Sequence, residues 1–276
     1  MRWLFRRRAT RWNAAKASNE LQDQLHAMDY EVYALLQLAQ DKQARAVVDE
    51  MIELKGVNPK LRTGPFAVAA SRARYVTERG DWKAAAALEV RPSPLPQAQA
   101  ITHFARAVGA ARSGDPAAAK ADIAKLGEFK DKLSQAKDAY WAGQVDIQRQ
   151  IANAWVLYAE GKREEALSAM SAAADAEDKT EKHPVTPGVP KPARELYGEM
   201  LLESGMAKDA LAAFEATLKK EPNRLGATVD AARAAEKAGD PAKAREYYEK
   251  VVAIAGGADK TRTDVSDARA FLAKKS

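Results

Sequence analysis

The feature that most constrains the fold is an internal repeat in residues 191–258. Two consecutive units of 34 residues, 191–224 and 225–258, carry small and large side chains at the same positions. The first unit has Gly198, Leu201, Gly205, Ala210, Phe214, Leu218 and Pro222, and the second has Ala232, Ala235, Gly239, Ala244, Tyr248 and Val252. Small residues at this spacing let two antiparallel helices approach closely and stack on the next pair. The sequence therefore predicts a stack of helix pairs.

The spacing Gly-x2-Leu…Gly-x4-Ala-x3-Phe…Pro resembles the tetratricopeptide repeat (TPR). The resemblance implies an all-α fold, a right-handed TPR-type superhelical solenoid of antiparallel helix pairs with a C-terminal capping helix. The predicted parts of this single solenoid are a half repeat with a basic N-terminus at 1–24, helix pairs at 25–58, 66–91, 98–130, 133–176, 191–224 and 225–258, a Pro-rich loop at 178–192 and a capping helix at 259–273.

The prolines support helices in the remainder of the chain. Each of the 12 prolines falls where a helix is expected to begin, end or be absent, because a proline inside a helix costs about 3 kcal/mol. The tripeptide Gly-Asp-Pro occurs at 114–116 and again at 239–241. Gly favours a left-handed helix end, Asp caps the next helix and Pro fits its first turn. Both tripeptides, and Gly80-Asp81, therefore predict a turn between two helices.

Residues 133–160 contain no proline. Apolar side chains recur there every three or four residues or at multiples of that spacing, from Ala136 to Tyr158. This periodicity predicts one helix of about 27 residues, roughly 40 Å long. Such a helix is longer than a standard repeat allows.

The formal charge of +6 is concentrated at the N-terminus, because Arg2, Arg6, Arg7, Arg8 and Arg11 contribute five positive charges. The rest of the chain is nearly neutral, so nucleic acid is not the expected partner. No apolar run reaches the ~20 residues of a membrane span, and the N-terminus lacks a secretory signal. We therefore expect a soluble, cytoplasmic protein without a transmembrane segment. The incomplete unit at 1–24 favours a native protein that extends upstream of Met1.

The loop at 178–192 has four prolines and is predicted to be stiff and extended. It is either a spacer between two segments of the solenoid or a functional loop. Its Glu-Lys-His-Pro-Val-Thr-Pro-Gly sequence, followed by two clear repeats, resembles a group of bacterial TPR proteins without assigned activity. That group supplies no reaction.

In TPR proteins the first helices of successive repeats line a concave groove that binds an extended peptide or a partner's helix. The resemblance places Tyr30, Tyr33, Arg74, Phe104, Arg112, Trp155, Tyr158, Glu199 and Arg233 at groove positions. Aromatic and arginine side chains suit binding because they offer large contact areas and planar hydrogen-bond donors. About half of them are expected instead to pack between helices. The carboxylate clamp of chaperone-binding TPR proteins is not reproduced, because Asp29 and Tyr33 occupy its first-unit positions.

No pattern in the sequence indicates an enzyme, a cofactor or a metal site. The chain has no cysteine, and His26, His103 and His183 have no partner at ligand spacing. The phosphate-loop, dinucleotide and nucleophile-elbow motifs are absent.

Three hypotheses about the function remain. The first is a non-catalytic scaffold for protein–protein interaction that binds a protein or peptide in its groove. The alternative is an electrostatic adaptor whose Arg-rich N-terminus attaches to nucleic acid or an anionic membrane, or the C-terminal part of a larger protein whose function lies upstream. Deletion of residues 1–11 would separate the adaptor from the scaffold, because only the adaptor would lose salt-sensitive binding.

Overall fold

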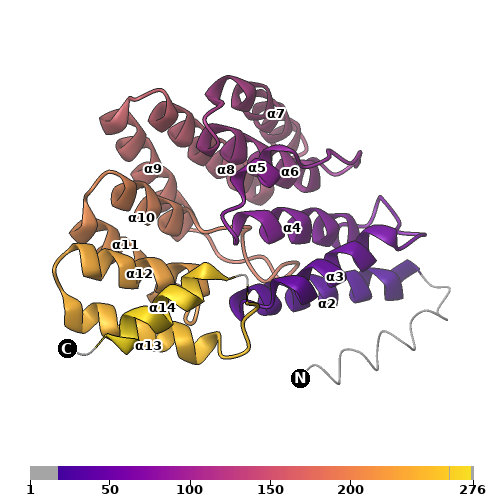
Figure 1. The fold of residues 1–276 in the computed structure, drawn as a ribbon. Helices are drawn as coiled ribbons and strands as arrows, with labels where there is room; N and C mark the ends of the chain where they lie inside the picture. Colours follow the sequence, from indigo (N-terminus) through magenta and orange to yellow (C-terminus); the bar gives the residue numbers. More distant parts are fainter. Residues whose placement is uncertain (1–17, 261, 275–276) are drawn as a thin grey trace.

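The fold is all-α. In the computed structural model, residues 18–260 and 262–274 are described, and they contain thirteen helices and no strand (Figure 1). The helices are α2 (Ser18–Gln37), α3 (Asp41–Glu53), α4 (Thr63–Thr77), α5 (Trp82–Ala86), α6 (Pro96–Arg112), α7 (Pro116–Gln135), α8 (Ala139–Ala159), α9 (Arg163–Asp178), α10 (Ala193–Glu203), α11 (Ala207–Lys220), α12 (Leu225–Lys237), α13 (Pro241–Ile254) and α14 (Thr263–Ala273). Each helix packs on the next, as in an α-solenoid.

The predicted turns are present at the Gly-Asp-Pro tripeptides. Gly114 and Gly239 have positive φ angles of 90° and 79°. Asp115 accepts a hydrogen bond from the backbone N–H of Ala118 at 2.9 Å, and Asp240 accepts one from Lys243 at 3.0 Å. Helices α7 and α13 then begin at the proline. These three residue types therefore act together as predicted.

The small residues of the repeat allow close packing inside each pair. A Cβ atom added at Gly198 in α10 would lie only 2.6 Å from the ring of Phe214 in α11. Glycine is therefore required at this position for the aromatic ring to seat against the neighbouring helix. Three hydrophobic cores run along the array, with α2 to α4 in one, α4 to α10 in the second and α10 to α14 in the third.

The predicted single helix over 133–160 is wrong. Helix α7 ends at Gln135, Lys137 has a positive φ of 58°, and α8 begins at Ala139. The carboxylate of Asp138 accepts a hydrogen bond from the N–H of Trp141 at 3.4 Å and caps α8. An aspartate cap and a left-handed lysine therefore make this turn without glycine or proline, which the apolar periodicity did not reveal.

The N-terminal region differs from the predicted half repeat. Helix α2 runs without a break from Ser18 to Gln37, so residues 18–24 belong to the same helix as 25–37. The Arg-rich residues 1–11, and the rest of the predicted half repeat up to residue 17, lie outside the described residues.

The two ends of the helix array meet (Figure 1). The N–H of Asp259 donates to the carbonyl of Ala39 at 2.9 Å, and the Asp259 carboxylate accepts from the N–H of Lys42 at 2.7 Å. The side chain of Gln37 accepts a hydrogen bond from the N–H of Leu225 at 2.8 Å. We call these links the closing contacts. They turn the array into a closed ring of helices.

Candidate functional site

The segment between α9 and α10, residues 179–192, crosses the inner side of the ring, and we call it the strap (Figure 1). Its backbone carbonyls accept hydrogen bonds from side chains of the surrounding helices. Arg74 donates to Val189 at 2.9 Å and to Gly188 at 3.1 Å. Tyr30 donates to the carbonyl of Thr186 at 3.2 Å. The strap is therefore held in the way an extended peptide is held in a groove.

This arrangement uses three of the predicted groove residues internally. The Arg74 side chain is fully buried and pairs with the buried carboxylate of Asp29 at 3.7 Å. The ring of Tyr33 lies 5.4 Å from the Arg74 guanidinium. Tyr30 and Arg74 are consequently engaged by the chain's own strap, and Tyr33 packs against Arg74.

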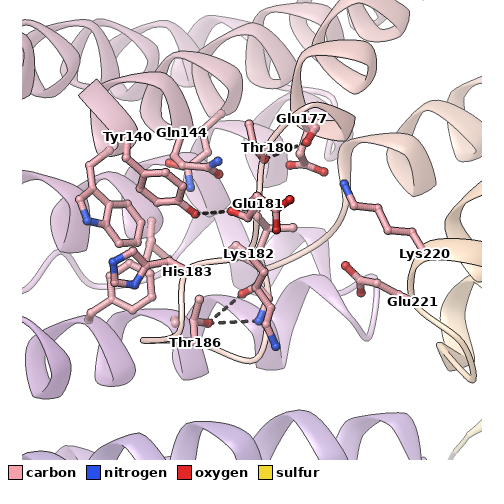
Figure 2. A pocket seen from close by; sticks show the side chains of 18 residues that line it. Tyr140, Gln144, Glu177, Thr180, Glu181, Lys182, His183, Thr186, Lys220 and Glu221 are labelled. Atoms are coloured by element: carbon pink, nitrogen blue, oxygen red, sulfur yellow. Dashed lines mark hydrogen bonds between the residues drawn. The ribbon is translucent and has the colours of Figure 1, made fainter. Parts of the chain in front are cut away.

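A small pocket of about 70 Å³ lies between the strap and helices α4, α6 and α8 (Figure 2). The ring of His183 lies 5.4 Å from Tyr140 and 5.0 Å from Trp141. The hydroxyl of Tyr140 donates to the carbonyl of Glu181 at 2.9 Å. This pocket is smaller than the ~300 Å³ of typical ligand sites. We assign it to the anchoring of the strap.

Glu177 stands at the edge of this pocket (Figure 2). Its carboxylate accepts a hydrogen bond from the N–H of Ala193 at 2.6 Å and so joins the end of α9 to the start of α10. Burial raises the pKa of Glu177 to about 7. The carboxyl group therefore changes its charge near neutral pH.

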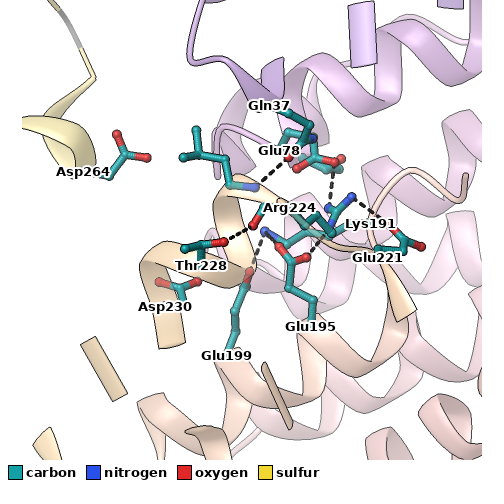
Figure 3. Close-up of polar contacts among 12 residues, drawn as sticks. Gln37, Glu78, Lys191, Glu195, Glu199, Glu221, Arg224, Thr228, Asp230 and Asp264 are labelled. Atoms are coloured by element: carbon teal, nitrogen blue, oxygen red, sulfur yellow. Dashed lines mark hydrogen bonds and ion pairs between the residues drawn. The ribbon is translucent and has the colours of Figure 1, made fainter. Parts of the chain in front are cut away.

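A buried ionic network follows the strap (Figure 3). The guanidinium of Arg224 is fully buried and contacts the carboxylates of Glu195 and Glu78, the latter at 2.7 Å. Lys191, at the end of the strap, lies 3.2 Å from Glu195 and 2.5 Å from Glu199. Burial opposes ionisation of Glu199, but Lys191 and Arg112 outweigh it and lower its pKa to about 2. Glu199 therefore stays ionised at neutral pH.

Arg112, Trp155 and Glu199 from the predicted set do come together. The Arg112 guanidinium stacks between two indoles, 4.1 Å from the ring centre of Trp82 and 4.0 Å from that of Trp155. It also pairs with the carboxylates of Glu199 and Glu203. Cation–π contacts and ion pairs thus satisfy this arginine on several sides.

A larger cavity of about 470 Å³ opens beside Arg112, and we call it the charged cavity. Its lining has six carboxylates and six cationic groups, which are Asp41, Glu78, Glu199, Glu203, Asp230, Asp264, Arg79, Arg112, Lys191, Arg233, Lys237 and Arg262. Burial, followed by the charge of Glu199, raises the pKa of Asp230 to about 6. The volume is sufficient for several side chains of a partner.

The remaining three predicted groove residues lie in three different environments. The ring of Phe104 is buried in the core. Tyr158 packs edge-on against Trp155 and lies 3.8 Å from the guanidinium of Arg163. Arg233 lines the charged cavity with 41% of its side chain exposed and pairs with Asp230 at 3.1 Å. Of the predicted set, Arg233 is therefore the residue most open to a partner in this cavity.

Sequence reasoning missed several members of the site. Trp82, Lys191, Glu203 and Arg224 are not at the groove positions of the repeat pattern. Trp82 directly follows the Gly80-Asp81 turn, and Lys191 lies at the end of the proline-rich loop. Their positions beside a turn or loop are the feature of the sequence that could have indicated a role in the site. In the described part of the chain, no group of three or more His, Asp or Glu side chains is arranged to hold a metal ion.

Comparison with known families gives a match in the C-terminal part of the chain. The model of the tetratricopeptide repeat matches residues 201–274, which include α11 to α14. Residues 201–274 therefore carry tetratricopeptide-repeat sequence, and the all-helical array is consistent with a solenoid of that type. TPR repeats are generally modules for protein–protein interaction, and the all-helical TPR fold is typically non-enzymatic. No curated protein matches the chain.

None of the helices between residues 18 and 274 is long and apolar enough to cross a bilayer.

Proposed function

We propose that this TPR protein is an interaction scaffold that binds a segment of a partner protein in the charged cavity. The observation that carries the proposal is the cavity itself, which has about 470 Å³ of space and is lined by residues of α6, α10 and α12. The general role of TPR repeats in protein–protein interaction supports it.

The strap limits where the partner binds. Because Tyr30 and Arg74 bind the strap and Tyr33 packs on Arg74, these residues stabilise the protein itself. Phe104, Trp155 and Tyr158 do the same through their packing contacts. Arg112 and Glu199 satisfy each other in the wall of the cavity. The partner then contacts the cationic side of α12, where Arg233 and Lys237 are one helical turn apart.

A partner segment with acidic side chains fits this position. Arg233 is partly exposed, and besides Asp230 it pairs only loosely, at 3.8 Å, with the solvent-exposed carboxylate of Asp267, which a partner carboxylate can replace. No ion pair within the described residues involves Lys237, which is exposed at the cavity edge. Charge-assisted hydrogen bonds from these two groups would orient the segment, while the surrounding walls supply contact area.

The test is selection from a phage-displayed library of random peptides, with the full chain as the target. We expect enriched peptides to contain Asp or Glu, and we expect Arg233→Glu to weaken their binding at least tenfold because attraction becomes repulsion. The matched control is Arg45→Glu on α3. Arg45 is also a partly exposed arginine that pairs within its own helix, with Asp49, but it lies outside the cavity.

Circular dichroism should show the same helicity for both variants. Equal binding of the selected peptides to the Arg233→Glu variant and the wild-type protein would refute the proposal, as would equal losses in the two variants.

A further inference from the structure

Helix α5 is much shorter than the corresponding second helices of the neighbouring pairs. It has 5 residues, whereas α3 has 13 and α7 has 20. The chain after α5 is held out of helix by Pro92 and Pro94, because proline and the residue before it disfavour the helical backbone. One side of α4 is therefore left without the length of helix that would normally cover it.

An apolar groove lies along this uncovered side of α4. It has a volume of about 300 Å³ and is lined by Ile52, Val57, Val68, Ala69, Pro92 and Ala98, among others. Val68, Ala69 and Arg72 face the groove, whereas Phe66 and Ala70 face the pocket beside the strap. Helical spacing places the centres of these two sets roughly 130° apart around the axis of α4, so they lie on different faces. We call this site the outer groove, since it lies across α4 from the strap.

Arg72 gives the outer groove a charge preference. Its side chain is only 10% exposed, and its one ion pair within the described residues is with Glu89 at 3.9 Å. Glu89 is 75% exposed and is also contacted by Arg91 at 3.8 Å. Two guanidinium groups thus share one solvated carboxylate. Burial, followed by the charge of Arg91, lowers the pKa of Arg72, which is the expected result for a buried cation with too little anionic compensation.

We propose that the outer groove binds an amphipathic helix of a partner protein, whose apolar side chains fill the groove and whose carboxylate pairs with Arg72. A helix is the fitting occupant because the groove lies where the second helix of this pair stops short. A carboxylate is the fitting charge because Arg72 and Arg91 carry two positive charges, whereas Glu89 supplies one negative charge. This site is independent of the charged cavity.

The volume of the outer groove determines how many apolar side chains of the partner helix it can hold. A space of about 300 Å³ accommodates roughly two or three aliphatic side chains. Spacing of i, i+3 and i+4 brings that number of side chains onto one face of a helix. The partner is then recognised by a short apolar stripe followed by one acidic residue.

The experiment uses a phage library of amphipathic helical peptides, randomised on one face, and the full chain as the target. We expect enrichment of peptides with apolar residues at i, i+3 or i+4 and an Asp or Glu beside them. Binding of a selected peptide should fall at least tenfold in Arg72→Glu and should be restored when the acidic residue of the peptide is changed to Arg. Arg91→Glu, at an exposed position, should weaken the same peptide even if Arg72→Glu folds poorly.

Two comparisons separate this site from the charged cavity. Arg233→Glu should leave binding of the selected helix unchanged, and Arg45→Glu should do the same as a surface control. Peptides that bind the Arg72→Glu and Arg91→Glu variants as tightly as the wild-type protein would overturn the proposal. It would also be overturned if no helix were enriched and the groove instead bound dodecanoate in an Arg72-dependent manner.

Discussion

At the scale of single residues, Glu177 links protonation to the packing of α9 against α10. Its buried carboxyl group accepts the N–H of Ala193, and burial raises its pKa from the ordinary 4.5 to about 7. Between these two values the folded protein holds a proton that the unfolded chain has lost. Stability from this group is therefore unaffected below pH 4.5 and decreases as the pH rises towards about 7.

We expect Glu177→Gln to be more stable than the wild-type protein at pH 8 and to lose that advantage at pH 4.5. The glutamine oxygen can still accept the N–H of Ala193, but it has no charge to bury. The advantage at pH 8 should reach roughly 3 kcal/mol at most. Urea unfolding at both pH values measures it, with Glu181→Gln at an exposed strap position as the control. Parallel stability curves for wild type and Glu177→Gln would contradict the expectation.

The repeat pattern in the sequence predicts some of the individual residues of the candidate site. It places Arg112, Trp155 and Glu199 at groove positions, and in the structure Arg112 contacts both of the other two side chains. Their use inside the protein was not predictable, because it depends on Trp82 and Lys191, which lie outside those positions. Arg74 illustrates the same limit. Its partners Gly188 and Val189 are more than 100 residues away in the sequence.

At the scale of helices, local chemistry determines where the turns lie. Gly-Asp-Pro has a distinct backbone role at each residue, so its two turns were predictable from the sequence. The turn between α7 and α8 uses Ala136, Lys137 and Asp138, of which only Asp138 is a typical turn residue. Apolar periodicity alone did not detect this turn, because the spacing of apolar residues in the sequence, such as Ala136 and Tyr140, remains helical across it.

The unusual backbone of Lys137 leads to a prediction for this turn. Lys137 has a φ of 58°, a conformation that costs a non-glycine residue about 1 kcal/mol or more. We expect Lys137→Gly to stabilise the protein by up to about 1 kcal/mol, since the greater freedom of glycine in the unfolded chain offsets part of the gain. Urea unfolding followed by circular dichroism measures the change.

Gly161 provides the reciprocal substitution. It occupies the turn between α8 and α9 with a φ of 81°, and an added Cβ atom would have no neighbour within 4 Å. Gly161→Ala should therefore destabilise the protein by about 1 kcal/mol through backbone conformation alone. Effects of the same sign for Lys137→Gly and Gly161→Ala would show that backbone conformation is not the cause.

At the scale of the whole molecule, Arg224 connects the two halves of the ring. It precedes α12, and its buried guanidinium contacts Glu195 of α10 and Glu78 at the end of α4 (Figure 3). Removing this cation would leave two buried carboxylates without their main compensation. We expect Arg224→Ala to destabilise the protein by about 3–5 kcal/mol.

The matched control is Lys250→Ala. Lys250 also pairs with a glutamate, Glu246, but both side chains are more than half exposed, so the loss should be at most about 1 kcal/mol. Thermal and urea unfolding would measure both variants. Similar small losses for the two would mean that the buried network does not join the halves energetically.

Closure of the ring has a consequence for how such a protein can change over generations. An open solenoid can gain or lose units at its ends, because each repeat contacts only its neighbours. Here Asp259 must reach Ala39 and Lys42, and Leu225 must reach Gln37. One duplicated unit would move these pairs apart and break the closing contacts. The closing contacts therefore fix the number of repeats. We expect this architecture to diversify by substitution within its helices rather than by tandem duplication.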